Sequence, residues 1–150
     1  MKDLLTTRAK IYCDYTVFMN ESFELFCENS APLLKENGIK LIIPQPVIDE
    51  MKAVPMSRMD DYALCYQGLA RIDKAVNDNI AVVVDSFDSG EYSEEYFYKL
   101  CEKSTEDIIA VTNDIQLITE LSDLCSNLNK PAGFLKIFEI EENGMIHRIR

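Results

Sequence analysis

Short apolar runs alternate with longer segments of helical periodicity, and this alternation limits the folds open to the chain more than any other feature. The strand-like runs are Lys10–Cys13, Ile39–Ile43, Ile80–Val84, Ile108–Val111 and Phe134–Ile140. Strands that alternate with helices usually form a parallel sheet with helices on both faces. We therefore expect an α/β fold, a three-layer sandwich whose central, mainly parallel five-stranded sheet is flanked by helices.

The segments between these runs have apolar residues at three- and four-residue steps, which is typical of helices. A first helix is expected from Asn20 or Ser22 towards Asn37-Gly38, with a turn reopening at Ser30 and Pro32. The other helices are expected at Val47–Lys52, from Ser57 to Asn77–Asn79, at Glu94–Lys103 and at Ile115–Leu128. The longest of them has a predicted buried face made of Met59, Tyr62, Ala63, Tyr66, Leu69, Ala70 and Val76.

The end of the chain predicts a hairpin. Asn143-Gly144 is a strong two-residue turn signal, and Met145–Ile149 can pair back onto the strand before it. With 150 residues, 47% of them apolar, the chain has the size of one ordinary domain, and we expect residues 1–150 to form a single one.

Cysteine and histidine usage points to a reducing environment without a zinc site. The five cysteines are odd in number and form no CxxC pair, and the chain has one histidine. No apolar run approaches the roughly 20 residues that span a bilayer, and the first residues lack a signal-peptide apolar stretch. We therefore expect a cytoplasmic protein with no membrane association and no disulfides.

The formal net charge of −11 counts against tight binding of nucleic acid. Proteins that bind nucleic acids are usually basic, because contacts to phosphates supply most of their affinity. The objection loses force if several carboxylates hold divalent cations, since two Mg²⁺ ions would bring four positive charges to the binding surface. Tight non-specific binding by the isolated chain is still not expected.

Four acidic positions occur where a sheet of this kind places its functional residues. Asp14 directly follows the first strand, and Asp114 follows the fourth after Thr112-Asn113. Glu50 lies on the short helix after the second strand, and Glu94 opens a later helix. The carboxyl ends of parallel strands form the functional crevice of such sheets. Like charges brought together there would favour a bound cation.

Three motifs in this order resemble those of PIN domains, a family of Mg²⁺- or Mn²⁺-dependent ribonucleases, over roughly Lys10 to Phe138. The first is the strand that ends in Asp14-Tyr15-Thr16, where the family usually reads DTN or DTS, so only the Asp matches. The second, LIIPQPVIDEM at Leu41–Met51, is similar to the family's strand, proline and Val-x-x-Glu. The third, IAVTNDIQL at Ile109–Leu117, is similar to its Thr-x-Asp.

The resemblance implies that Asp14, Glu50, Glu94 and Asp114 bind Mg²⁺ or Mn²⁺ and are catalytic. Glu94 fits the third acid by spacing, although the family normally has Asp there, and Glu91 and Glu95 are close competitors, with Asp88 a weaker one. Thr112, and also Thr16 or Asn113, could orient a carboxylate or a ligand water. Several basic side chains could meet phosphates at the mouth of the cleft, namely Lys52, Arg58, Lys99 and Lys103.

The leading hypothesis is a metal-dependent endoribonuclease, of the toxin type or active in RNA processing. Family analogy adds RNA as substrate, an antitoxin or other protein as a partner, and a homodimer. The alternative is a catalytically weakened PIN-like module for protein interaction or regulation, which the altered first motif and the acidic charge favour. A nucleotide-binding or receiver-like domain is a weaker hypothesis, since the chain has no glycine-rich phosphate loop.

Overall fold

A mostly parallel sheet forms the centre of the molecule in the computed structural model, which describes residues 9–150. The sheet has six strands in the order β3-β2-β1-β4-β5-β6. Every neighbouring pair is parallel except β5 and β6, which are antiparallel. The strands are β1 (Lys10–Cys13), β2 (Leu41–Pro44), β3 (Ala81–Val84), β4 (Ile108–Val111), β5 (Leu135–Ile140) and β6 (Ile146–Arg148).

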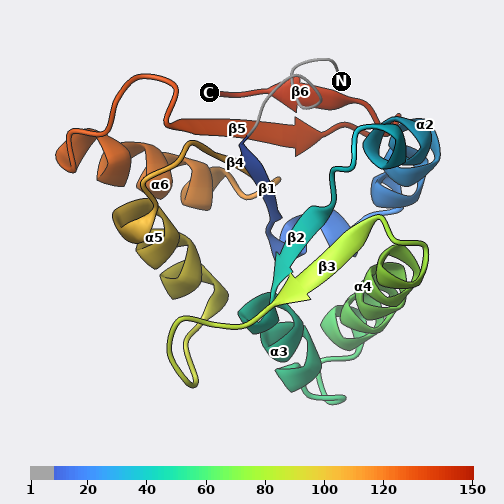
Figure 1. The fold of residues 1–150 in the computed structure, drawn as a ribbon. Coiled ribbons are helices and arrows are strands. Elements are labelled where there is room, and N and C mark those ends of the chain that lie inside the picture. Colours follow the sequence, from blue (N-terminus) through green and yellow to red (C-terminus); the bar gives the residue numbers. More distant parts are fainter. Residues whose placement is uncertain (1–8) are drawn as a thin grey trace.

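Helices cover both faces of this sheet, which gives the three-layer α/β sandwich predicted from the sequence. Helices α5 and α6 lie on one side and α2 and α4 on the other (Figure 1). The helices are η1 (Tyr15–Met19, a 3-10 helix), α2 (Ser22–Glu36), α3 (Gln45–Ala53), α4 (Met59–Asn77), α5 (Ser93–Lys103) and α6 (Ile115–Asn127). Among residues 9–150, no helix combines the length and the apolar character needed to cross a bilayer.

The two central strands carry the core. All four residues of β4 are buried, as are Ile11, Tyr12 and Cys13 of β1. Apolar side chains from the helices close the core on both faces, including Phe23 and Phe26 of α2 and Phe97 of α5. Continuous apolar sequence in β4 thus reflects burial on both sides, as expected for a central parallel strand.

The buried face of α4 differs from the predicted one. Cys65, Gly68, Ile72 and Ala75 are buried, whereas Tyr66, predicted as a core residue, is 68% exposed. A Cβ at Gly68 would lie 2.5 Å from Met51 Cε and 3.1 Å from the Phe18 carbonyl oxygen. The helix therefore approaches α3 and η1 through its small residues, which periodicity of large apolar residues does not identify.

A further prediction, the turn at Ser30 and Pro32, was wrong. Helix α2 continues through Pro32. Proline has no amide to donate to the Glu28 carbonyl oxygen one turn earlier. Because Pro32 and Glu28 are both exposed, water can solvate that carbonyl. Strand β3 is not covered on both faces: it lies at the edge of the sheet, and Val82 is 39% exposed.

The predicted hairpin is present, with a longer connection than a two-residue turn. Ile140 pairs with Ile146, and the Gly144 amide donates to the Glu141 carbonyl oxygen over 2.9 Å. Gly144 has a φ of 80°, while Asn143 is not in the positive region. A Cβ at Gly144 would lie 2.6 Å from Leu25 Cβ and 2.7 Å from Phe26 N, so the turn packs directly on α2.

Replacing Gly144 by alanine should therefore destabilise the protein more than the same change at Gly133. Both glycines have positive φ, but nothing lies within 4 Å of a Cβ at Gly133. Left-handed backbone alone should make Gly133→Ala cost about 1–2 kcal/mol, and the clash with α2 should add roughly 1–3 kcal/mol for Gly144→Ala. Urea unfolding measures both, and equal losses would contradict the close packing of the turn on α2.

Candidate active site

The order of the strands places a crevice between β1 and β4. From β1 the chain moves outward through β2 to β3, and then returns to place β4 on the other side of β1. Ligand sites of open α/β sheets lie outside the carboxyl ends of the strands at such a switch point. Asp14 follows β1 here, and its amide donates to the Val111 carbonyl oxygen of β4 over 3.0 Å.

A pocket of about 560 Å³ opens at this point, and all four predicted acids line it. The structure thus brings Asp14, Glu50, Glu94 and Asp114 to one place although they are distant in sequence. Its acidic lining residues are Asp14, Glu50, Glu94, Glu95, Asp114 and Glu120, and its tyrosines are Tyr15, Tyr92 and Tyr98. Sequence reasoning singled out neither Glu120 nor the tyrosines.

Asp14 is the most deeply placed of these acids. Its residue is only 2% exposed, and its Oδ2 accepts hydrogen bonds from Thr16 Oγ1 and Thr112 Oγ1, each over 2.9 Å. Burial raises the pKa of the Asp14 carboxyl, and the hydrogen bonds from Thr112 and Thr16 partly oppose that rise. The threonines therefore stabilise the ionised form in a place where water cannot.

The two threonines also bind the turn after β4. Thr112 Oγ1 accepts from the Asp114 amide over 3.0 Å, and Thr16 Oγ1 accepts from the Asn113 amide over 2.9 Å. Each hydroxyl thus donates to Asp14 and accepts from the backbone. Thr112 is fully buried and does not line the pocket, and its hydroxyl contacts the pocket residue Asp14. The Asn113 side chain instead binds the backbone of Ile140 and orients no carboxylate.

Asp114 caps helix α6 as well as lining the pocket. Its Oδ1 accepts from the amides of Gln116 and Leu117 over 3.0 and 3.3 Å. A carboxylate at this position satisfies free amide groups and interacts favourably with the helix dipole. Capping accounts for the fixed orientation of this side chain and uses only its Oδ1.

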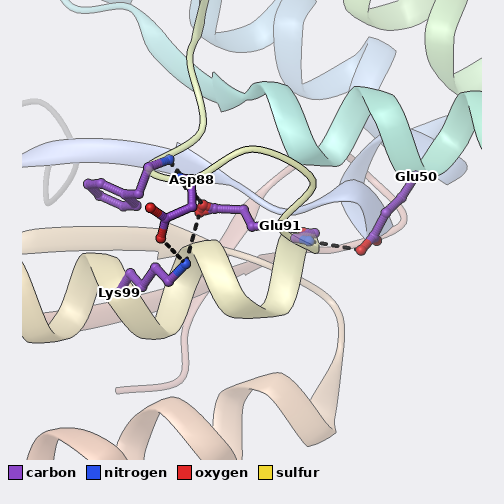
Figure 2. A network of polar contacts seen from close by, with 6 residues as sticks. Glu50, Asp88, Glu91 and Lys99 are labelled. Carbon is purple, nitrogen blue, oxygen red and sulfur yellow. Dashed lines mark hydrogen bonds and ion pairs between the residues drawn. The ribbon is translucent and has the colours of Figure 1, made fainter.

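Glu50 reaches from α3 to the beginning of α5. Its Oε1 accepts from the Ser93 amide over 2.8 Å, at a helix end where Tyr92 provides no side-chain cap (Figure 2). Glu50 therefore caps α5 from another element. The contact ties α3 to α5 across the pocket and holds the Glu50 carboxylate at its wall.

Glu91, one of the competitors for the third acid, binds its own loop and does not line the pocket. Its carboxylate accepts from the Phe87 amide over 3.0 Å and from the Asp88 amide over 3.1 Å, and Lys99 Nζ lies 3.8 Å away (Figure 2). Glu91 does not line the pocket, and neither does Asp88, which pairs with Lys99. Glu94 and Glu95 both do, so they remain the candidates for the third acid.

Glu94 contacts the same phenol as a second carboxylate, that of Glu120. The Tyr98 hydroxyl contacts both Glu94 and Glu120. Burial and these two contacts raise the pKa of Tyr98, while the hydrogen bond from Tyr98 lowers the pKa of Glu120. Glu120 belongs to α6, so this contact joins α5 and α6 at the edge of the pocket.

Tyr15 lies among the predicted acids. Burial raises the pKa of its phenol, and the negative charges of Asp14, Asp114 and Glu50 raise it further. These three carboxylates therefore act on one hydroxyl group that lines the pocket. The sequence held one signal for Tyr15: it directly follows Asp14, at the position where the family motif has Thr.

Among residues 9–150, no basic side chain lines this pocket, in contrast to the expectation for its mouth. Arg58 pairs with Asp61, Lys99 pairs with Asp88, and Lys103 lies over the Phe87 ring. Lys52 is exposed and is not a lining residue either. Within residues 9–150, Asp14, Glu50, Glu94 and Asp114 form no ion pair with any Lys, Arg or His.

The donor set suits a hard cation held partly by water. Carboxylate oxygens are the ligands that Mg²⁺ prefers, and Mg²⁺ commonly keeps several waters beside one or two carboxylates. In the part of the chain from residue 9 onward, no three acidic, His or Cys side chains lie close enough to share one ion. The hydrogen bonds that hold Asp14, Glu50 and Asp114 go to one oxygen of each carboxylate. The arrangement therefore fits a largely hydrated ion better than a closed carboxylate cage.

Comparison with known proteins supports the fold. The solved structure of the PIN domain endonuclease Utp24 matches with a TM-score of 0.53 and 14% identity, covering 94% of this chain and 91% of that one. No family model and no curated protein sequence matches the chain. The chain therefore has a PIN-like fold, as its motifs predicted, and at this identity the likeness concerns the fold alone.

Replacing Asp14 by asparagine should stabilise the metal-free protein at neutral pH. The folded pKa of Asp14 lies above its unfolded value, so folding favours the protonated form and the free energy of unfolding falls as pH rises through this window. Asparagine stays neutral and keeps an oxygen for both threonines. At pH 3 the free energy of unfolding of the variant should be equal to or below that of the unsubstituted protein. At pH 7 it should be higher by about 1–2 kcal/mol.

Urea unfolding in EDTA from pH 3 to 7 measures this difference. Taking the difference between the two proteins removes the contribution of every other titrating group. A difference that stays constant over this pH range would contradict a destabilising, ionised Asp14 at neutral pH.

Proposed function

We propose that this protein is a Mg²⁺- or Mn²⁺-dependent endoribonuclease. The observation that carries the proposal is the pocket at the switch point of a PIN-like fold, to which the described part of the chain contributes six carboxylates and no basic residue, with Asp14 buried in it. So many like charges are costly together without a cation. The similarity of the fold to that of a PIN domain endonuclease is consistent with this proposal.

Asp14, Glu50, Asp114 and Glu94 or Glu95 are the proposed metal ligands. A divalent ion held there would lower the pKa of a bound water towards neutrality and offset the charge that develops on the phosphate. The chain itself supplies positioning: Thr16 and Thr112 orient Asp14, and backbone amides hold Glu50 and Asp114. Fixed carboxylates reduce the reorganisation needed at the moment of reaction.

The proposal extends to RNA as the substrate and to a cytoplasmic enzyme of one domain. The acidic surface favours a target that is presented together with cations or by a partner, because the chain lacks the positive charge that supports non-specific binding. A toxin-type enzyme would have an antitoxin as partner, whereas an RNA-processing enzyme would work within a larger assembly.

Cleavage of RNA should require a divalent cation and the central acids. Asp14→Asn and Asp114→Asn remove a ligand charge with little change in volume, and each should lower the cleavage rate by at least about 100-fold, or 2.7 kcal/mol of transition-state stabilisation. A fluorescent single-stranded RNA in Mn²⁺ or Mg²⁺, with EDTA as the blank, provides the measurement.

Asp123→Asn is the matched control for this experiment. Asp123 is exposed on α6, the helix that Asp114 caps, and it does not line the pocket. Its substitution should leave cleavage unchanged. Cleavage that persists in both Asp14→Asn and Asp114→Asn, or that proceeds fully in EDTA, would reject the proposed function.

A PIN-like module without catalysis is the second candidate. The separation of the acids favours it, since no three of them share one point within residues 9–150. The net charge of −11 favours it as well. Calorimetric titration with Mn²⁺ separates the two candidates: no heat of binding at millimolar metal, with the fold intact, would support the module.

A further inference from the structure

A phosphodiester needs hydrogen-bond donors, and the pocket offers few. Its lining, drawn from the described residues, contains six carboxylates and no Lys, Arg or His. Carboxylates repel phosphate oxygens and cannot donate to them when ionised. Neutral donors must therefore complement whatever cations bind in this pocket.

Two neutral donors of the pocket already have acceptors. The Tyr98 hydroxyl contacts Glu94 and Glu120, and the Gln116 side-chain amide donates to Glu120 over 3.1 Å. Tyr92 is 64% exposed at the rim. The Tyr15 hydroxyl makes no hydrogen bond to any residue from 9 to 150, although three carboxylate charges act on it.

From this arrangement we propose that Tyr15 is a phosphate-binding residue whose hydroxyl donates to a non-bridging oxygen of the scissile phosphate. The inference rests on the proposed function, since it needs a cation among Asp14, Glu50 and Asp114 to bring the phosphate there. Tyr15 then supplies the hydrogen bond that basic residues supply in less acidic sites.

The chemistry of a phenol suits this position better than that of a lysine. A phenol hydroxyl donates a hydrogen bond as a neutral group, so it does not add charge. A lysine would pair with the carboxylates and compete with the cation for them. The Tyr15 ring is half-buried against the core and begins η1 directly after Asp14, so the hydroxyl position is restrained.

Tyr15→Phe removes only this hydroxyl and is the first test. Because the hydroxyl bonds no described residue, the variant should unfold at the same temperature as the unsubstituted protein. Cleavage of single-stranded RNA in Mn²⁺ should fall by about 100- to 1000-fold in kcat, the range expected when one donor to developing negative charge is lost. Tyr66→Phe, at an exposed position of α4 that does not line the pocket, is the matched control and should cleave normally.

Sulfur substitution in the substrate tests for direct contact. A phosphorothioate at the scissile position weakens hydrogen-bond acceptance by the replaced oxygen. If Tyr15 donates to that oxygen, one of the two stereoisomers should slow the unsubstituted protein several-fold more than it slows Tyr15→Phe, because contacting groups give non-additive effects.

The outcomes separate the inference from the function on which it rests. Normal cleavage by Tyr15→Phe would overturn the role of Tyr15 but not the nuclease activity. The same holds if each phosphorothioate stereoisomer slows the variant and the unsubstituted protein equally. Absence of metal-dependent cleavage by the unsubstituted protein would overturn both.

Discussion

The hydrogen bonds from two threonines to the buried carboxylate of Asp14 are the interaction on which the site depends. Thr16 lies on η1 after β1, and Thr112 follows β4, so Asp14 is held from both central strands. Because each hydroxyl also accepts an amide of the turn at Asn113 and Asp114, the same contacts set the start of α6. The position of Asp114 thus follows from the anchoring of Asp14.

The uncompensated negative charge of this pocket favours a bound cation. A buried carboxylate raises the free energy of the folded state at neutral pH unless a cation accompanies it. Asp14 has no basic partner among residues 9–150, and its pocket adds further carboxylates. In the proposed function, a divalent ion relieves this cost and provides the positive charge that the acidic chain otherwise lacks.

Much of the fold could be predicted because its signals are local. Apolar runs such as Ile108–Val111 and the alternation with helices determine the parallel sheet, and the gathering of the four acids follows from its topology. The face of α4 could not be predicted, because it depends on the close approach of Gly68 to Phe18 and Met51. Nor could the choice between Glu91 and Glu94 be made. Whether an acid near the start of α5 lines the pocket or binds its own loop depends on contacts such as those of Glu91 with the Phe87 and Asp88 amides.

The proposed function requires a divalent ion beside Asp14, and anomalous diffraction from a crystal soaked in Mn²⁺ would reveal one. We expect an anomalous peak in the pocket, with Asp14 and at least one of Glu50 and Asp114 at about 2.0–2.2 Å or bridged through water. An intact, fully soaked crystal with no peak near Asp14 would contradict it.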